Sequence, residues 1–134
     1  MKKHAKLRAL VVDDAEISRR IVCRISCNAF EHEQAENGLV AFEKYRQAVE
    51  MGKPFDIVFM DVIMPEMDGK ESVRRIRQYE ESIAMPNVPI IMVTASEMID
   101  EIEKLVHGLL RKVINKPQLE QMLQNLFPGR IAPL

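Results

Sequence analysis

The chain has 134 residues, of which 47% are hydrophobic and 29% are charged, and its net charge is -1. This length and composition predict one globular domain with a buried core. The chain has 19 basic and 20 acidic residues, so it lacks the basic character of a nucleic-acid-binding protein. We therefore expect no nucleic-acid partner. No stretch approaches the roughly 18 apolar residues of a membrane span, so we expect no membrane insertion.

The chain begins MKKHAKLRALVVDD, in which a short apolar stretch is interrupted by Arg8. This pattern is not typical of a secretory signal peptide. We therefore expect a cytoplasmic protein in which Cys23 and Cys27 are reduced thiols. No further Cys or His has the spacing that would make these two cysteines part of a metal site.

The first predicted strand is Leu7–Val12, an apolar run of the kind that is buried on both faces of a parallel sheet. A helical pattern follows, with apolar residues four apart and two more that widen the stripe. These residues are Ile17, Ile21 and Ile25, with Val22 and Ala29. Cys23 and Cys27 fall opposite Ile21 and Ile25 on this helix, so we expect both thiols to be at least partly exposed.

The middle of the chain repeats this alternation of strand and helix. A weaker strand candidate, His32–Ala35, precedes a helical segment from about Leu39 to Val49. The next strand is Phe55–Met60, and the turn pair Asp68-Gly69 precedes a third helix. This third helix includes Val73, Ile76 and Arg77.

The last part of the chain contains the strand Val88–Val93 and a weaker strand, Lys112–Asn115. Between them, the spacing of apolar residues predicts a fourth helix, formed by Met98, Ile99, Ile102, Leu105, Val106 and Leu109. A fifth helix follows Pro117, which suits a first helical turn. Its apolar residues are Leu119, Met122, Leu123, Leu126 and Phe127.

This (βα)5 order predicts an α/β fold with a five-stranded parallel sheet and helices on both faces. For this number of strands, the flavodoxin-like strand order 2-1-3-4-5 is the usual arrangement. We expect a single domain over residues 1–134, with a core of about 7–127 and a frayed tail at 128–134.

Polar side chains follow four of the five predicted strands. Asp13 and Asp14 follow the first strand, Asp61 the third, Thr94 the fourth and Lys116 the fifth. In an open parallel sheet, ligands bind beyond the carboxyl ends of the strands, so we expect these side chains to lie close together.

Three carboxylates at one edge repel one another unless a cation compensates for their charge. Oxygen ligands of this kind suit a hard divalent cation such as Mg²⁺. A metal ion and a lysine that face a carboxylate can stabilise phosphoryl oxygens. The carboxylate can itself act as a nucleophile and form an aspartyl phosphate.

The segments LVVDD, MDVIMPEMDG, PIIMVTAS and INKP resemble the receiver domain of two-component response regulators, over about residues 7–127. The resemblance implies that Asp61 accepts a phosphoryl group and that Asp14 binds Mg²⁺ or Mn²⁺ directly, with Asp13 acting through water. It also implies metal binding by Asp61 and by the carbonyl of Ile63, and contacts of Thr94 and Lys116 with the phosphoryl group. The loop and switch positions implied by the family are Pro65, Gly69, Ala95, Val113 and Pro117, and the Lys116–Pro117 bond is often cis in this family.

The function implied by this resemblance is phosphorelay signalling and not enzymatic turnover. The donor would be a histidine kinase or a histidine phosphotransfer protein, whose helices dock in this family over the first helix and the loop after the last strand. A downstream protein, which the sequence does not identify, would receive the signal. The chain could be a stand-alone regulator or the receiver of a hybrid histidine kinase, and the style of its motifs favours the hybrid kinase.

One position departs from the family pattern. The family usually has Tyr or Phe three residues before the lysine, and here that position is Val113. Valine has little surface to bury and one stiff torsion, so the aromatic part of the conformational switch is predicted to be absent. Reception of the phosphoryl group does not depend on this ring.

Two other functions are compatible with this fold class. A phosphohydrolase of the haloacid dehalogenase type also uses a strand-end aspartate, but it needs a carboxylate two residues later, where this chain has Ile63. A pseudo-receiver, which binds partners without being phosphorylated, typically lacks acidic or lysine positions that are all present here. Dinucleotide and P-loop binding are excluded, because neither GxGxxG nor GxxxxGK[ST] occurs.

Overall fold

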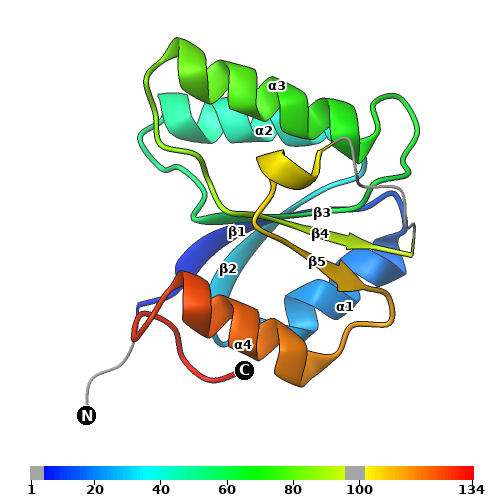
Figure 1. Ribbon diagram of the computed structural model, residues 1–134, viewed down its shortest axis with the longest axis vertical. Helices are drawn as coiled ribbons and strands as arrows, with labels where there is room; N and C mark the ends of the chain where they lie inside the picture. The colour runs from blue at the N-terminus through cyan, green and yellow to red at the C-terminus, as the bar shows by residue number, and fades with distance from the viewer. Residues whose placement is uncertain (1–4, 96–101) are drawn as a thin grey trace.

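The computed structural model describes residues 5–95 and 102–134. The chain alternates strands and helices in the predicted order over most of its length (Figure 1). In chain order the elements are β1 (Leu7–Val12), α1 (Glu16–Ile25), β2 (Phe30–Ala35), α2 (Gly38–Glu50), β3 (Ile57–Met60), α3 (Gly69–Ser82), β4 (Ile90–Thr94), the 3-10 turn η1 (Glu103–Leu105), β5 (Gly108–Arg111) and α4 (Lys116–Leu126).

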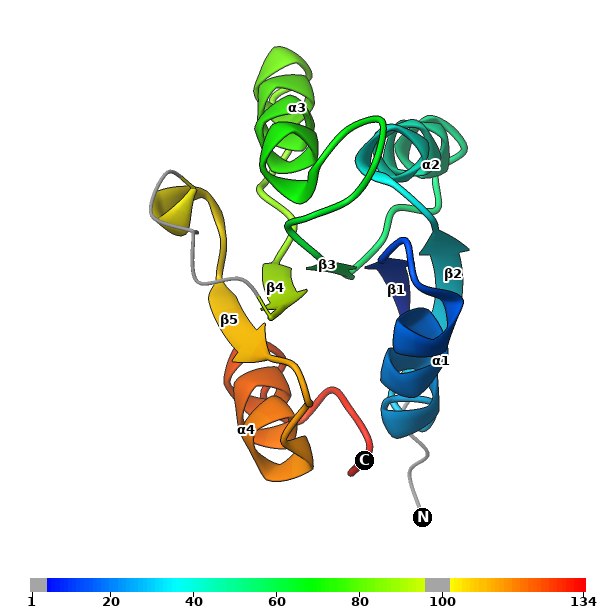
Figure 2. The ribbon, with the colours of Figure 1, turned by 90° about the vertical axis from the view of Figure 1, so that its right-hand side faces the viewer.

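The five strands form one parallel sheet in the order β2-β1-β3-β4-β5, which confirms the predicted flavodoxin-like arrangement. Helices α2 and α3 cover one face of the sheet, and α1 and α4 cover the other (Figure 2). None of the helices in the described part of the chain has the length and apolar character needed to cross a bilayer.

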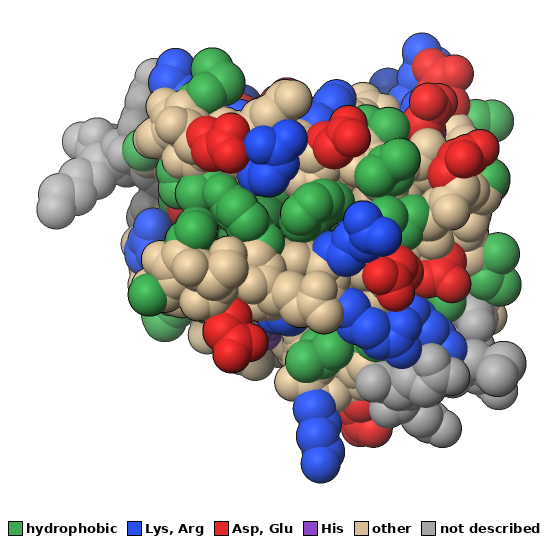
Figure 3. Space-filling view, turned by 90° about the horizontal axis from the view of Figure 1, so that it is seen from above, with side chains coloured by type: hydrophobic (Ala, Val, Ile, Leu, Met, Phe, Trp, Pro, Cys, Tyr) green, Lys and Arg blue, Asp and Glu red, His purple; other side chains and the backbone are tan. Residues whose placement is uncertain are grey.

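Each face of the sheet has its own hydrophobic core, because side chains alternate along each strand. In β1, Leu10 and Val12 pack toward α2 and α3, while Ala9 and Val11 pack toward α1 and α4. On the outer surface of α2 and α3, acidic and basic side chains are interspersed among hydrophobic ones (Figure 3). This face is therefore of mixed charge and not basic.

The connection between β4 and β5 differs from the sequence prediction. The predicted fourth helix reached Leu109, but Leu109 lies in β5, which pairs with β4 from Ile91↔Gly108 to Thr94↔Arg111. The described part of this connection contains the 3-10 turn η1, while Met98 and Ile99 lie outside the described residues. The predicted strand Lys112–Asn115 is also wrong, since these residues form the loop between β5 and α4. A short apolar run suits a helix or a strand equally well, and here the hydrogen bonds to β4 decide in favour of a strand.

Helix α1 is rotated relative to the predicted apolar stripe. Val22 is buried, whereas Ile17 and Ile21 are 74% and 43% exposed. Cys23 is half-buried and Cys27 is exposed just beyond the helix, so the thiol exposure agrees with the prediction although the assumed phase does not. The helix contributes Val22, Cys23 and Ile25 to the core, whereas Ile17 and Ile21 are exposed.

The C-terminal tail is packed against the domain and not frayed as predicted. Ile131 is 3% exposed and belongs to the core beneath α1 and α4, together with Phe127. The backbone N–H of Arg130 donates to the carbonyl of Phe127 (3.0 Å), which turns the chain back toward the sheet. Burial of this isoleucine removes apolar surface from water and fixes the tail.

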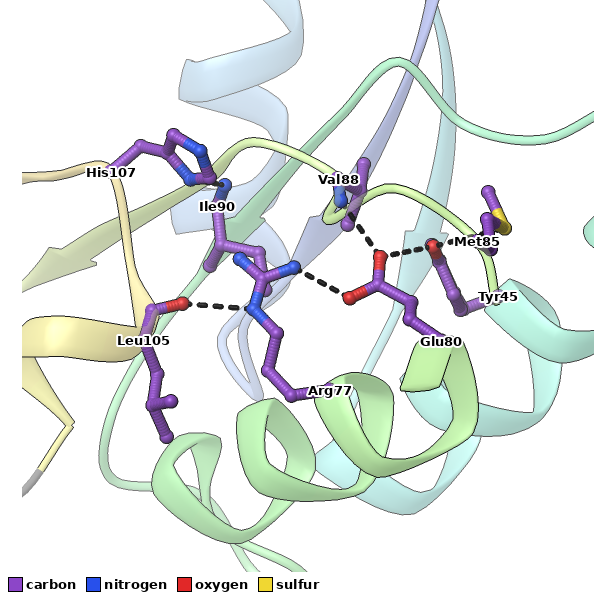
Figure 4. Close-up of polar contacts among 8 residues, drawn as sticks. All are labelled: Tyr45, Arg77, Glu80, Met85, Val88, Ile90, Leu105 and His107. Carbon is purple, nitrogen blue, oxygen red and sulfur yellow. Dashed lines mark hydrogen bonds and ion pairs between the residues drawn. The ribbon is translucent and has the colours of Figure 1, made fainter. Parts of the chain in front are cut away.

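A buried polar network ties α3 to the strands that it covers (Figure 4). The Glu80 carboxylate is fully buried and accepts hydrogen bonds from the Tyr45 hydroxyl (2.7 Å), the Arg77 guanidinium (2.8 Å) and the Val88 N–H (2.7 Å). Arg77 also donates to the carbonyl of Leu105 in η1 (2.9 Å). Because the buried Glu80 carboxylate and the Arg77 guanidinium both have hydrogen-bond partners, this network fixes the start of β4 and the connection to β5 relative to α3.

Candidate functional site

The carboxyl ends of β1, β3 and β4 bring three predicted site residues to one edge of the sheet. Asp13 directly follows β1, Asp61 directly follows β3, and Thr94 is the last residue of β4. All three are buried, at 5%, 7% and 1% exposure, whereas the neighbouring Asp14 is exposed. The two buried carboxylates lie where apolar strands end, so each needs a compensating partner.

That partner is Lys112, which the sequence analysis did not select. Its ammonium group lies 2.6 Å from an Asp13 oxygen and 2.9 Å from an Asp61 oxygen, and it donates to both carboxylates. The backbone N–H of Lys112 donates to the carbonyl of Thr94 (3.2 Å), which sets the lysine level with the end of β4. The predicted residue, Lys116, is instead the exposed first residue of α4.

The assignment to Lys116 is wrong because a helix begins there. The Asn115 side chain caps α4 by accepting from the N–H of Gln118 (2.9 Å), and Pro117 occupies the first turn. A residue after a helix cap cannot end a strand, so the strand must stop earlier and the strand-end lysine is Lys112. The sequence contains this signal, since Asn followed by a first-turn Pro marks a helix start.

Burial and charge shift the pKa values of this centre. Burial raises the pKa of Asp13, and hydrogen bonds from Lys112 and from the Ala15 N–H only partly offset that effect. Burial alone would lower the pKa of Lys112, but its hydrogen bonds to Asp13 and Asp61 outweigh burial and raise it. The lysine therefore stays charged and acts as a fixed cation between two carboxylates.

The three acidic residues of the sheet edge fit a divalent cation. Asp13, Asp14 and Asp61 can each offer an oxygen, and these atoms lie within 4.8 Å of one another. Carboxylate oxygens gathered in this way suit Mg²⁺ or Mn²⁺, which would retain several waters at an open site. The Ile63 residue, whose carbonyl the family resemblance adds to this set, lies in the loop after β3 with its side chain 70% exposed.

The loop after Asp61 is closed on itself by backbone hydrogen bonds. The N–H of Gly69 donates to the Val62 carbonyl (2.8 Å), and the N–H of Met67 donates to the Pro65 carbonyl (2.8 Å). A Cβ atom on Gly69 would lie 1.9 Å from the Asp61 carbonyl oxygen, so only glycine fits there. Pro65 and Gly69 thus shape the loop that leads from the carboxylate of Asp61 into α3.

The remaining predicted switch positions lie around the same edge. Ala95 is exposed directly after β4, and Val113 is 91% exposed directly after Lys112. Among the described residues, the cis peptide bond is Lys112–Val113 and not the predicted Lys116–Pro117. Because the strand-end lysine is Lys112, the residue three positions before it is Leu109 and not Val113. Leu109 is half-buried and is also aliphatic, so the aromatic ring is absent from this position too.

A hollow of about 170 Å³ opens beside the lysine, between α1 and the loop after β5. Its lining is mainly apolar, with Asp13, Ser18 and Lys112 as the polar members. The exposed side chains of Ile21 and Val113 also line this hollow. The carboxylate centre is thus bordered on one side by an apolar surface that is accessible to another molecule.

Comparison with known protein families gives one assignment. The model of the response regulator receiver domain matches residues 9–127. The chain is 32% identical to the two-component response regulator ORR41 of Oryza sativa subsp. japonica, over 87% of this chain and 88% of that protein. It is also 36% identical to histidine kinase CKI1 of Arabidopsis thaliana, over 92% of this chain but 12% of that kinase. The chain therefore spans a small part of the histidine kinases that it matches.

Solved structures show the same fold. The receiver domain of Arabidopsis thaliana CKI1 complexed with Mg²⁺ and BeF3⁻ superposes with a TM-score of 0.75 and is 33% identical, with 90% of this chain and 89% of that chain covered. The CheX–CheY complex from Borrelia burgdorferi matches with a TM-score of 0.77 at 22% identity, with coverage of 90% and 89%.

Proposed function

The chain belongs to the response regulator receiver domain family, and on this basis we propose that Asp61 accepts a phosphoryl group in a two-component phosphorelay. The observation that carries the proposal is the position of Lys112, whose ammonium bridges Asp61 and Asp13 at the sheet edge. A carboxylate paired with a fixed cation, beside two further carboxylates that can hold a metal, is the arrangement that phosphoryl transfer to an aspartate requires.

In the proposed step, an oxygen of Asp61 attacks the phosphorus of a phosphohistidine on the donor protein. The new P–O bond forms as the P–N bond breaks, and the imidazole nitrogen leaves with the electron pair. Lys112 remains beside the acceptor oxygen and offsets the negative charge that builds up on the phosphoryl oxygens. In this proposal Thr94, which is buried at the end of β4, donates its hydroxyl to the same oxygens.

Asp13, Asp14 and Asp61 would hold Mg²⁺ or Mn²⁺ in this proposal. When bound, the ion would neutralise the phosphoryl oxygens and orient them for in-line attack. The proposal is supported by the Mg²⁺-containing structure of the CKI1 receiver, a relative that is 33% identical to this chain.

The donor is proposed to be a histidine kinase or a histidine phosphotransfer protein that docks over α1 and the loop after β5. Ile17, Ile21 and Val113 expose 74%, 43% and 91% of their surface there, beside the hollow at Lys112. Burial of this apolar surface would stabilise the complex and exclude water from the reacting carboxylate. We further propose that the domain acts in the cytoplasm and passes a signal on without enzymatic turnover.

The experiment is intact mass spectrometry after incubation with Mg²⁺ and acetyl phosphate. The wild type should gain one phosphoryl group, and Asp61→Asn should gain none. Equal labelling of Asp61→Asn would reject the proposal. Ile21→Asp should be labelled normally by acetyl phosphate but slowly by a phosphotransfer protein that labels the wild type, and an unchanged rate would reject the docking surface.

A further inference from the structure

Gly38, the first residue of α2, lies directly against the loop that follows Asp61. Its N–H donates to the Met67 carbonyl (2.8 Å), and its own carbonyl accepts from the hydroxyl of the buried Ser72 (2.8 Å). A Cβ atom at position 38 would lie 2.5 Å from the Met67 carbonyl oxygen and 2.8 Å from that of Asp68. Both are backbone atoms, so any side chain here must displace either the helix or the loop.

Space, and not backbone conformation, explains the glycine at this position. Gly52 and Gly129 have positive φ angles of 75° and 69°, which favour glycine, whereas Gly38 does not have a positive φ. The start of α2 could therefore hold an alanine without backbone strain if the loop and Ser72 of α3 were not in contact with it.

The loop that Gly38 contacts is the one that carries the candidate metal ligands. Asp61 begins the loop, Ile63 lies within it, and Gly69 closes it against the Asp61 backbone. Gly38 contacts its returning half at Met67 and Asp68. The loop is therefore held at two places, by the hydrogen bond from Gly69 to Val62 and by the hydrogen bond from Gly38 to Met67.

We propose that Gly38 is a positioning residue for the metal site, because its lack of a side chain lets α2 brace the loop that carries Asp61 and Ile63. This inference rests on the proposed function, in which these residues hold Mg²⁺. A side chain at position 38 displaces the loop, which moves oxygen ligands from positions that Mg²⁺ requires within narrow limits. The helix that covers the sheet thereby determines how tightly the site binds its ion.

The test compares the Mg²⁺ affinity of the wild type, Gly38→Ala and Gly52→Ala. Gly52 follows the other end of α2 and has no heavy atom within 4 Å of an added Cβ, so alanine there strains the backbone without touching the loop. Gly38→Ala should raise the Mg²⁺ dissociation constant about 10-fold in an NMR titration at a temperature where all three proteins are folded. Gly52→Ala should match the wild type.

A second measurement needs no metal. Amide hydrogen exchange over residues 62–69 should be faster in metal-free Gly38→Ala than in the wild type, and unchanged in Gly52→Ala. If Gly38→Ala does not fold, Ser72→Ala removes one of the two bonds at Gly38 and should raise both the exchange rates and the Mg²⁺ dissociation constant. If the variant that folds, Gly38→Ala or Ser72→Ala, has the Mg²⁺ affinity and the amide exchange rates of the wild type, the inference is wrong. A wild type that does not bind Mg²⁺ would reject the proposed function, and the exchange data would still decide whether Gly38 braces the loop.

Discussion

The Lys112 ammonium lies closer to Asp13, at 2.6 Å, than to Asp61, at 2.9 Å. The lysine therefore neutralises a candidate metal ligand as well as the proposed acceptor. A metal ion at Asp13 would share this carboxylate with the ammonium, and the two positive charges would repel each other.

Lys112→Ala should lower the stability of the metal-free protein and raise its affinity for Mg²⁺. Without the ammonium, the neighbouring carboxylates lose their cation, which should cost roughly 1–3 kcal/mol in the free energy of unfolding. Thermal unfolding with and without Mg²⁺ measures this, and Mg²⁺ should restore most of the loss. Labelling of Asp61 by acetyl phosphate should slow at least about 10-fold.

Lys116→Ala is the matched control for this experiment. Lys116 lies only four positions away but is exposed at the start of α4, so its removal should change neither Mg²⁺ affinity nor labelling. If Lys116→Ala slowed labelling and Lys112→Ala did not, the assignment of the strand-end lysine would be wrong.

Asp14→Asn should abolish labelling without destabilising the metal-free protein. Asp14 is exposed next to two buried carboxylates, and removal of its charge relieves repulsion while a metal ligand is lost. Differential scanning calorimetry of the metal-free protein should show an equal or higher melting temperature. A clear decrease would indicate that Asp14 has a structural role.

Much of this site could be predicted from sequence, because buried parallel strands are continuous apolar runs and their ends are easy to locate. Asp13 and Asp61 directly follow two such strands, and Thr94 is the last residue of a third. The fifth strand is only four residues long and lies at the sheet edge, so its apolar signal merged with that of the preceding segment. For this reason the sequence predicted Lys116 as the strand-end lysine, four positions after the correct residue, Lys112.

The phase of α1 was mispredicted for a different reason. Ile17 and Ile21 match a core stripe, yet both are exposed, because α1 packs on the core through Val22 and the partly buried Ile25. The spacing of apolar residues indicates that a helix has an apolar face. It does not indicate whether that face is covered by the same domain or by another protein. Exposed apolar residues on α1 are accounted for by the docking surface proposed for the donor.

Glu80→Ala should destabilise the protein by about 3–5 kcal/mol, because it leaves the Arg77 guanidinium buried without its carboxylate. Tyr45→Phe, which removes one hydrogen bond to Glu80, should cost about 1.5–3 kcal/mol. Urea denaturation measures both changes. Glu81→Ala, at the adjacent exposed position, should change stability by less than about 0.5 kcal/mol. Similar losses for Glu80→Ala and Glu81→Ala would contradict the role of the network.

Stability should decrease as the pH falls below about 6.5, partly through His107. The Nδ1 atom of His107 accepts from the Ile90 N–H (3.2 Å), which requires a neutral nitrogen. Partial desolvation and the nearby Arg77 lower the pKa of His107, although Glu80 opposes them. As the pH falls, His107 is protonated in the unfolded chain at a higher pH than in the folded protein. Acid therefore favours the unfolded state.

The measurement is the free energy of unfolding at several pH values between about 7.5 and 5. The pKa of His32 is also lowered, by burial and by Lys6, so His107→Asn should reduce the slope without removing it. An unchanged slope in His107→Asn would show that the imidazole of His107 does not contribute to the acid sensitivity.

The candidate site draws its charged groups from distant parts of the chain. Asp13 and Lys112 are separated by 99 positions, and the lysine follows the last strand to join the sheet. A nascent chain that has emerged only through β4 already contains every candidate carboxylate but lacks the cation that pairs with them. The ion pairs of Lys112 with Asp13 and Asp61 therefore form only after β5 has docked, so the proposed acceptor gains its cation last during synthesis.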